Sequence, residues 1–327
     1  MSFSDIAGHE RVKDFLLASY KEDRIAHAYI FHGQEGIGKR LAAQEFFKFL
    51  ICRDNSGGDS CGRCKFCRKM DAGAAIDWIV VEKESRDSVI KVDRIREILK
   101  IVHFPPMEAK YRGILIDNAE TISIEAVSAL LKTLEEPPPS TYFFLISSKP
   151  EQIPDTIHSR CSKVYFQHLR KDEIYDLIRS KHQLNDADAM LAASLSGGSM
   201  GMAEALPGEK IFQERRDILL AFMGTEPSDH AQVLNFLNNL ENQSSEIQQF
   251  LTLMRIFLRD LILARSGFDA KITNVDLAAE IRDFARKTSF QTIAGLYGVI
   301  EKADEFLSYH ANRKLVSEWL AFSLFEQ

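Results

Sequence analysis

Short apolar runs, rich in β-branched and aromatic residues, alternate with helical patterns from residue 28 to about residue 168. The runs predict strands over 28–32, 77–82, 113–117, 141–147 and 163–167, and the segments between them predict helices over 38–50, 92–102 and 123–135. Strands that alternate with helices are typical of a parallel sheet covered on both faces. The sequence therefore predicts an α/β domain with a parallel five-stranded sheet, whose ligands bind at the carboxyl ends of the strands.

The pattern changes after residue 168, where no further apolar run predicts a strand. Residues 169–208 contain short helical patterns interrupted by SGGSMG, and residues 209–327 contain longer amphipathic helices. In EIQQFLTLMRIFLRDLILA, apolar side chains recur at helical spacing, as on a helix face buried in a core. These side chains are Ile247, Phe250, Leu251, Met254, Phe257, Leu258 and Leu261. We therefore expect three domains, over 1–168, 169–208 and 209–327.

Composition and charge restrict the class of protein. The chain has 327 residues, of which 45% are hydrophobic, and a formal net charge of -6. This acidity argues against a protein that coats nucleic acid unaided, because such proteins need a basic face to displace counterions. No apolar run approaches the roughly 18 residues that a membrane span needs, and the first residues lack the basic start and apolar centre of a signal peptide. We expect a cytoplasmic protein with no membrane partner.

The stretch FHGQEGIGKR has the spacing of a phosphate-binding loop, and it lies directly between a predicted strand and a predicted helix. Gly33, Gly36 and Gly38 let backbone N–H groups turn toward phosphate, and Lys39 would reach the outer phosphates. Arg40 stands where a serine or threonine would place a hydroxyl on Mg²⁺, and a cation there offers no lone pair and repels the metal. Phosphate binding can survive this change, but Mg²⁺-dependent hydrolysis should suffer.

The predicted strand in GILIDNAE ends at Asp117, whose carboxylate could bind the metal beside the phosphates. A plain strand-end turn residue is the competing interpretation, and the presence of Lys39 in the loop favours the metal role. In active motors of this kind a glutamate usually follows, and it polarises the attacking water. Asn118 holds that place here and cannot accept a proton. The chain thus departs from an active motor at two positions.

Four of the five cysteines cluster as Cys52-x₈-Cys61-x₂-Cys64-x₂-Cys67. A tetrahedron of four thiolates is a closed, structural zinc site, and the spacing favours zinc over unliganded cysteines or an iron–sulfur cluster. The basic residues around the cysteines favour a solvated loop over a nucleic-acid contact. These basic residues are Arg53, Arg63, Lys65, Arg68 and Lys69.

These motifs, together with three longer stretches, resemble the AAA+ subunits of bacterial sliding-clamp loaders, and within them the delta-prime type. The stretches are GHERVKDFLLASYKEDRIAHAYIFHGQEGIGK, ILIDNAETISIEAVSALLKTLEEPPPSTYFFLISSKPEQIPDTIHSRC and HANRKLVSEWL. The resemblance is specific over residues 4–168 and weak over 169–327. It implies a RecA-like AAA+ module with a zinc insertion at about 52–67, a small three-helix lid, and a helical collar that joins subunits into an open ring.

The resemblance also implies an activity and partners. Such loaders use ATP to open the ring-shaped clamp and place it on primed DNA, and they are accessory to a DNA polymerase, which is a nucleotidyltransferase. A delta-prime-type subunit would bind gamma/tau and delta subunits through its collar and reach the clamp and DNA indirectly. Its zinc would be structural, whereas binding of ATP and Mg²⁺ is left open by the altered loop.

The resemblance assigns roles to further positions. In HSRC, Arg160 matches an arginine finger that the family supplies to the ATP of the adjacent subunit, although an isolated arginine would more simply be a surface charge. Ser147 or Ser148 matches a polar sensor of the outer phosphate, with a plain strand-end serine as the alternative. Met202 stands where ATP-using relatives carry a lid arginine. Together with Arg40, these positions imply a subunit that donates a finger and does not itself hydrolyse ATP.

Two other functions stay open on the sequence. A gamma/tau-like motor subunit would hydrolyse ATP with another base, for instance Glu120. A zinc-dependent nucleic-acid-binding protein would bind DNA in a strongly salt-dependent way, which the acidic composition disfavours.

Overall fold

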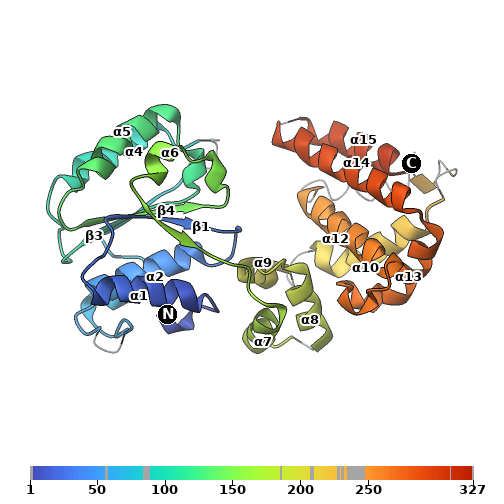
Figure 1. Cartoon of the computed structure of the whole chain (residues 1–327), viewed down its shortest axis with the longest axis horizontal. Coiled ribbons are helices and arrows are strands. Elements are labelled where there is room, and N and C mark those ends of the chain that lie inside the picture. Colours follow the sequence, from blue (N-terminus) through green and yellow to red (C-terminus); the bar gives the residue numbers. More distant parts are fainter. Residues whose placement is uncertain are drawn as a thin grey trace. The chain divides into compact units, whose positions relative to one another are not determined.

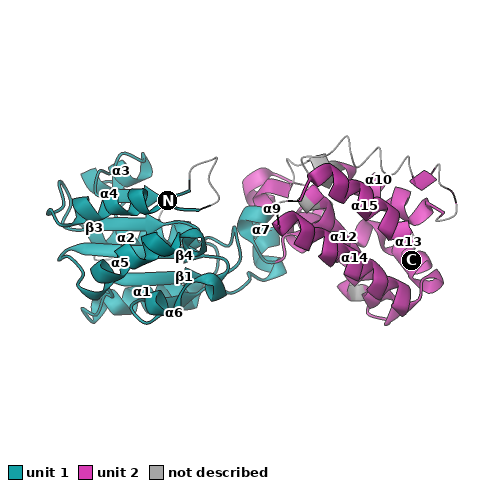
Figure 2. Cartoon of the chain, turned by 90° about the horizontal axis from the view of Figure 1, so that it is seen from above, with its two compact units in different colours: residues 1–177, 198–202 teal, residues 178–197, 203–327 magenta. Residues whose placement is uncertain are grey.

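The structure, a computed structural model, describes residues 3–55, 58–83, 89–184, 186–206, 210–226, 229, 232–233, 247–309 and 311–325. Its contacts divide the chain into two compact units, which Figure 2 shows in different colours. Unit 1 comprises residues 1–177 and 198–202, and unit 2 comprises residues 178–197 and 203–327.

Unit 1 is built on a five-stranded sheet in which every strand pairing is parallel, as predicted (Figure 1). The strands lie in the order β2-β3-β4-β1-β5. Their bounds are Ala28–His32 (β1), Trp78–Val81 (β2), Arg112–Ile116 (β3), Thr141–Ser147 (β4) and Ser162–Tyr165 (β5). The bounds of β1 and β4 agree with the prediction, and the others differ by one or two residues. Because the strands are parallel, their carboxyl ends meet at one edge of the sheet, where a ligand site is expected.

Helices cover both faces of this sheet (Figure 1). Their bounds are Glu10–Lys21 (α1), Lys39–Ile51 (α2), Val92–Val102 (α4), Ile124–Glu135 (α5) and Asp155–His158 (α6). Side chains alternate between the faces of a strand, so Tyr29 and Phe31 of β1 pack with α1 and α2, whereas Ala28 and Ile30 pack with α4, α5 and α6. The predicted helices over 38–50, 92–102 and 123–135 are confirmed within one residue as α2, α4 and α5.

The cysteine segment between α2 and β2 contains the helix α3 (Lys65–Asp71). Lys48 of α2 attaches this helix, because its ammonium lies 2.8 Å from the Asp71 carboxylate and 2.6 Å from Glu45. Lys48 is fully buried, and a buried charge is tolerated when it is paired in this way. The segment therefore has a fixed place on α2.

The rest of the described chain is helical, and it includes no strand after residue 165. The helices are α7 (Lys171–His182), α8 (Asp186–Leu195), α9 (Met200–Ala205), α10 (Lys210–Gly224), α12 (Ile247–Arg265), α13 (Ala278–Lys287), α14 (Phe290–Ser308) and α15 (Arg313–Phe325). Short 3₁₀ helices occupy Phe3–Asp5, Ala119–Thr121, Pro150–Gln152, Asp269–Lys271 and Val275–Leu277. All seven apolar side chains predicted to form a stripe in α12 are buried in the core of unit 2. None of the described helices is both long and apolar enough to cross a membrane.

The two compact units do not follow the predicted domain boundaries. Unit 1 continues past residue 168 to residue 177 and takes in residues 198–202. The boundary predicted between residues 208 and 209 falls outside the described residues. The division into three domains therefore stays a prediction.

Candidate nucleotide site, finger arginine and metal centre

Residues 33–38 form a loop that leaves the carboxyl end of β1 and leads into α2, whose first residue is Lys39. Gly36 and Gly38 have φ angles of 72° and 103°, a left-handed conformation that glycine adopts without a steric penalty. A Cβ on Gly36 would lie 2.6 Å from the hydroxyl of Ser199. The backbone thus has the form that the glycine spacing predicts, while its binding of phosphate stays a prediction.

The side chain of Lys39 folds back and binds the loop that precedes it. Its ammonium donates hydrogen bonds to the carbonyl oxygens of Gly33 and, at 2.7 Å, of Gln34. Burial lowers the pKa of Lys39, although the carboxylates of Glu120 and Asp117 oppose that shift. The lysine is only 6% exposed, so a phosphate would have to draw it away from two carbonyl groups.

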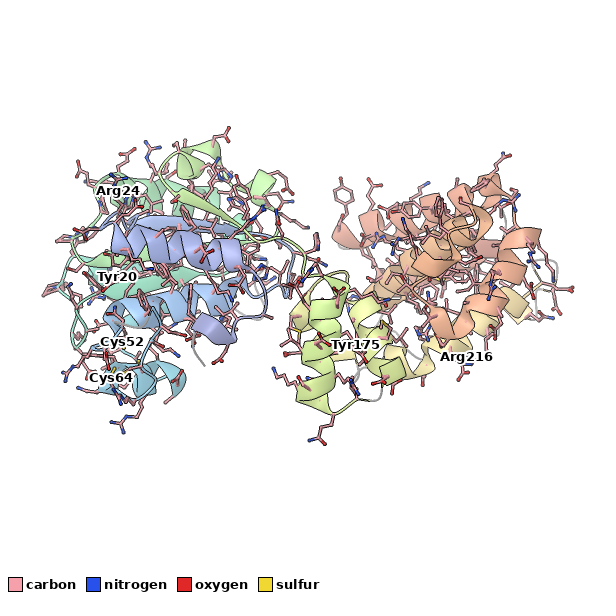
Figure 3. All side chains as sticks on the ribbon, turned by 60° about the horizontal axis from the view of Figure 1, so that its bottom comes forward. Tyr20, Arg24, Cys52, Cys64, Tyr175 and Arg216 are labelled. Atoms are coloured by element: carbon pink, nitrogen blue, oxygen red, sulfur yellow. The ribbon has the colours of Figure 1, made fainter. Side chains whose placement is uncertain are left out.

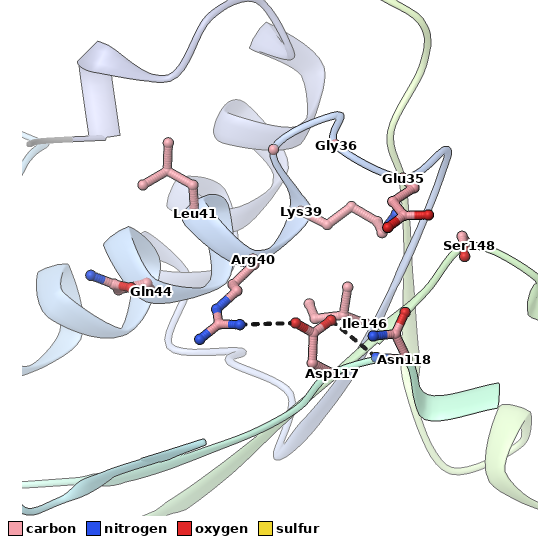
Figure 4. A pocket seen from close by; sticks show the side chains of 11 residues that line it. Glu35, Gly36, Lys39, Arg40, Leu41, Gln44, Asp117, Asn118, Ile146 and Ser148 are labelled. Atoms are coloured by element: carbon pink, nitrogen blue, oxygen red, sulfur yellow. Dashed lines mark hydrogen bonds and ion pairs between the residues drawn. The ribbon is translucent and has the colours of Figure 1, made fainter. Parts of the chain in front are cut away.

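Arg40, in the first turn of α2, reaches across the edge of the sheet to two carboxylates. Its Nη1 lies 3.1 Å from Oδ2 of Asp117, which follows β3 (Figure 4). The same atom forms a second ion pair with Glu82, which follows β2. The two carboxylates are near one another because β2 and β3 are neighbouring parallel strands. The carboxylate predicted to bind Mg²⁺ is therefore paired with a guanidinium.

A pocket of about 450 Å³ lies between this loop and the strand ends (Figure 4). Ser148 lines it, whereas Ser147 does not; Ser147 is fully buried and its hydroxyl accepts a hydrogen bond from the Lys149 amide at 3.1 Å. Of the two serines considered as a phosphate sensor, Ser148 is thus the one that faces the pocket. Ser148 also binds Glu120, whose Oε1 accepts a hydrogen bond from the Ser148 hydroxyl at 2.9 Å.

Asn118 follows Asp117 in a left-handed conformation, with φ of 50°. Its amide N–H donates a 3.0 Å hydrogen bond to Oδ1 of Asp117. Asp117 is therefore held by two groups, its neighbour's amide on one oxygen and Arg40 on the other. The side chain of Asn118 lines the pocket where the motor glutamate is expected.

Residues 198–202 brace the loop within unit 1. The Ser199 hydroxyl donates to the Glu35 carbonyl at 3.0 Å, and the Gly201 amide donates to the Gly36 carbonyl at 2.8 Å. A Cβ on Gly201 would lie 2.8 Å from the Gly36 carbonyl oxygen. Met202, at the expected position of a lid arginine, follows directly and is 43% exposed, so no guanidinium enters the pocket from it.

Arg160 lies apart from this pocket, two residues beyond α6. Its side chain is 31% exposed and forms an ion pair with Glu135, the last residue of α5. It also donates to the Thr156 carbonyl at 2.8 Å and the Ser159 hydroxyl at 3.0 Å. The guanidinium of Arg160 therefore binds groups of its own chain.

His32, the last residue of β1, is buried just before the loop, and both of its ring nitrogens lack a hydrogen-bond partner among the described residues. Its ring stacks between those of His158 and Tyr165, with centroid distances of 5.5 Å and 4.9 Å. Burial, together with the positive charges of His158, Lys163 and Lys39, lowers the pKa of His32 to about 4. This imidazole is therefore neutral near pH 7.

The four clustered cysteines converge, with all their sulfur atoms within 4.8 Å of one another; Cys52 and Cys64 are labelled in Figure 3. The sulfur atoms of Cys52 and Cys67 are 3.6 Å apart, near the ~3.8 Å that a tetrahedron with 2.3 Å Zn–S bonds requires. The amides of Cys64 and Cys67 donate to the sulfur atoms of Cys61 and Cys64 at 3.4 Å and 3.5 Å. This group of residues could hold a metal ion.

The chemistry of these donors fits a soft divalent metal. Burial raises the pKa of the Cys52 and Cys67 thiols, and a metal ion deprotonates the thiols that coordinate it. Four sulfur donors also close a tetrahedral site, so no position remains for a catalytic water. Four cysteines that could hold a metal ion are therefore the donor set expected of a structural site, and that role stays a prediction.

Three of the five basic residues around the cysteines form ion pairs with carboxylates. Arg63 lies 3.0 Å from the carboxylate of Asp54, and Lys69 and Lys65 both pair with Glu108, the latter at 3.8 Å. Pairing of this kind supports the solvated-loop interpretation over a nucleic-acid contact.

Comparison with known proteins places the chain in a family. The family described as "DNA polymerase III, delta subunit" matches residues 8–170, and that described as "DNA polymerase III, delta subunit, C terminal" matches residues 209–323. The DNA polymerase III subunit delta' of Escherichia coli K12 is 31% identical over 285 residues, which cover 86% of this chain and 83% of that protein. The chain belongs to the DNA polymerase III delta' family. The observed parallel five-stranded sheet and helical C-terminal part agree with the α/β and then all-α fold predicted from the sequence.

The chain is also similar in sequence to another subunit of DNA polymerase III. The tau subunit of Bacillus subtilis 168 is 26% identical over 340 residues, which cover 97% of this chain but only 60% of tau. A solved structure of a DNA polymerase III gamma subunit-related protein from Thermotoga maritima aligns with 96% of this chain and 98% of its own, at 16% identity and a TM-score of 0.48.

Sequence reasoning missed several side chains that this member of the delta' family brings to its site. Glu82 and Glu135 were given no role from the sequence, although Glu135 lies in one of the stretches that carry the resemblance; each is identified by the cation it contacts. His32 precedes the loop in FHGQEG, and its buried, unpartnered ring gives no signal in the sequence. Glu82 is the last residue of the strand predicted over 77–82, and this place at a strand end is the signal in the sequence that could have found it.

Proposed function

We propose that this chain is a clamp-loader subunit of the DNA polymerase III holoenzyme that does not hydrolyse ATP itself and donates Arg160 to the ATP site of an adjacent subunit. The observation that carries the proposal is the pairing of Arg40 with Asp117 and Glu82. It places a cation beside Asp117, the carboxylate that a motor would use for Mg²⁺. The chain would act in the cytoplasm as an accessory to DNA synthesis.

Several features support the absence of hydrolysis. Mg²⁺ needs oxygen ligands near the β- and γ-phosphates, whereas Arg40 offers only N–H donors and positive charge. Asn118 cannot take a proton from an attacking water. Glu120, the candidate substitute, accepts a hydrogen bond from Ser148, which reduces its capacity to act as a base. Each feature acts on a different part of the reaction.

The donated finger is supported by position and exposure. Arg160 follows the short helix α6 and remains partly accessible, away from the chain's own pocket. A guanidinium stabilises charge that builds on the transferring phosphoryl oxygens, an effect of roughly 10³ to 10⁵ in rate. A chain that keeps this group while blocking its own metal site is suited to act on a neighbour.

The zinc would be structural, and the partners would be gamma/tau and delta subunits. Four sulfur donors and the anchoring of α3 by Lys48 support a role in stabilising the fold. Exposed apolar side chains on the C-terminal helices, such as Leu315 at 63% and Phe322 at 45%, support a collar that contacts other subunits. Contacts with the sliding clamp and primed DNA would be made through the assembled loader.

The second candidate is a gamma/tau-like motor subunit, which the similarity to tau over 97% of the chain favours. A titration of the purified chain with ATP, with and without Mg²⁺, and a hydrolysis assay separate the two functions. We expect no Mg²⁺-dependent hydrolysis and no gain in ATP affinity on adding Mg²⁺. Hydrolysis that Lys39→Ala abolishes would support the motor and contradict the proposal.

A further inference from the structure

Glu135 and Arg160 are brought together by the packing of α5 against the segment that follows α6. Leu134, next to Glu135, and Ile157, three residues before Arg160, are each only 1% exposed and lie in the same hydrophobic core. The backbone segments that carry the two charged residues are therefore held together by this core. The side chains themselves stay near the surface, with 50% of Glu135 and 31% of Arg160 exposed.

The chain uses most of the donors of Arg160. Nη1 donates to the Thr156 carbonyl and the Ser159 hydroxyl, and Nη2 donates to the Glu135 carboxylate. Nε is buried and has no partner among the described residues. A guanidinium has five N–H donors, so few of them remain to meet a phosphate while these contacts hold.

The contact between Glu135 and Arg160 is reversible because both side chains are partly exposed. Glu135 is the last residue of α5, where the partial negative charge of the helix end disfavours a carboxylate and so favours a nearby cation. Exposed ion pairs, however, shift equilibria only modestly, by about fivefold at most. A phosphate with two or three negative charges can therefore compete with this carboxylate for the guanidinium.

We infer that Glu135 is a positioning residue that holds Arg160 against its own chain until phosphates of a neighbouring subunit displace it. This inference rests on the proposed role of Arg160 as a finger. The ion pair competes with that role, so removing the charge of Glu135 increases the fraction of chains in which the guanidinium is free. Glu136, adjacent and exposed but with no ion pair in the described structure, provides a matched control.

The isolated chain tests the contact without any assumption about function. Arginine-specific modification by phenylglyoxal, followed at Arg160 by mass spectrometry, reports how accessible the guanidinium is. We expect Glu135→Gln to speed modification of Arg160 about two- to fivefold, and Glu136→Gln to leave the rate unchanged. Equal rates in the wild type and Glu135→Gln would overturn the inference.

The reconstituted loader tests the consequence. In single-turnover ATP hydrolysis, Glu135→Gln should raise the rate constant about two- to fivefold, while Glu136→Gln should match the wild type. The double variant Glu135→Gln with Arg160→Ala should hydrolyse at the rate of Arg160→Ala alone, because the glutamate acts only through the arginine. A structural role for Glu135 would lower the rate, or would change it without Arg160, and either result overturns the inference. If Arg160→Ala itself hydrolyses at the wild-type rate, the proposed function fails, whatever the modification experiment shows.

Discussion

The Arg40 guanidinium lies 3.1 Å from the Asp117 carboxylate, so a side chain of the protein stands where a metal-binding carboxylate would need its metal. The contact joins the first turn of α2 to the end of β3, across 77 positions of the sequence. Glu82 completes it from the neighbouring strand end. In the proposed function, the arginine that stands in place of the Mg²⁺ hydroxyl ligand also supplies a cation that pairs with Asp117 and Glu82.

Replacing Arg40 with threonine should restore a response to Mg²⁺. The threonine hydroxyl supplies the missing ligand, and Asp117 is released from its ion pair. We expect Mg²⁺ to raise the ATP affinity of Arg40→Thr at least tenfold, or about 1.4 kcal/mol, in a calorimetric titration of the purified chain. Arg40→Ala removes the cation without adding an oxygen, so it should gain less. A Mg²⁺ response in Arg40→Thr equal to that of the wild type would refute this explanation.

The cysteine cluster should hold one zinc ion that stabilises the fold. Cys64→Ser removes a thiolate ligand, so zinc content measured by mass spectrometry should fall well below one ion per chain. Loss of at least 1 kcal/mol of stability should accompany it and lower the melting temperature by several degrees. Cys161→Ser, outside the cluster, should keep its zinc. Full zinc occupancy in Cys64→Ser, or an unchanged melting temperature after chelation, would contradict a structural site.

His32 should make stability fall in mild acid. Its pKa is lowered from 6.5 to about 4 in the folded chain, so below pH 6.5 the unfolded chain binds a proton that the folded chain excludes until the pH approaches 4. Between pH 7.5 and 5.5 the wild type should lose about 1.4 kcal/mol more of its free energy of unfolding than His32→Gln. Urea unfolding at the two pH values measures this difference.

His103→Gln is the control for that measurement, because His103 is exposed at the end of α4. It should show the same pH dependence as the wild type. If His32→Gln also loses as much stability as the wild type between the two pH values, the buried imidazole does not titrate as described.

The fold was predictable because local patterns specify it. The strand β4 reads as the continuous apolar run TYFFLIS, and a strand buried on both faces needs such a run. The stripe from Ile247 to Leu261 is buried as its helical spacing predicts. The short helix α3 was not predicted, because seven residues are too few for an apolar period to emerge.

The site was predictable only in part. The glycines and cysteines carry fixed spacings, so their backbone form and their convergence follow from the sequence. The partners of Arg40 and Arg160 depend on the order of strands and on helix packing, which spacing along the chain does not encode. Likewise, the sequence FFLISS does not decide which of two serines is the candidate phosphate sensor. The structure distinguishes them, because Ser148 lines the pocket and Ser147 is buried.

The most direct measurement compares two variants of this chain in a reconstituted clamp loader, with ATP hydrolysis stimulated by clamp and primed DNA as the readout. Arg160→Ala should slow single-turnover hydrolysis at the adjacent site at least tenfold, since a full finger effect is roughly 10³ to 10⁵, while size-exclusion chromatography shows intact assembly. Lys39→Ala should hydrolyse like the wild type. Wild-type hydrolysis in Arg160→Ala, or a loss of hydrolysis in Lys39→Ala, would contradict a subunit that has given up its own ATP reaction and serves that of its neighbour.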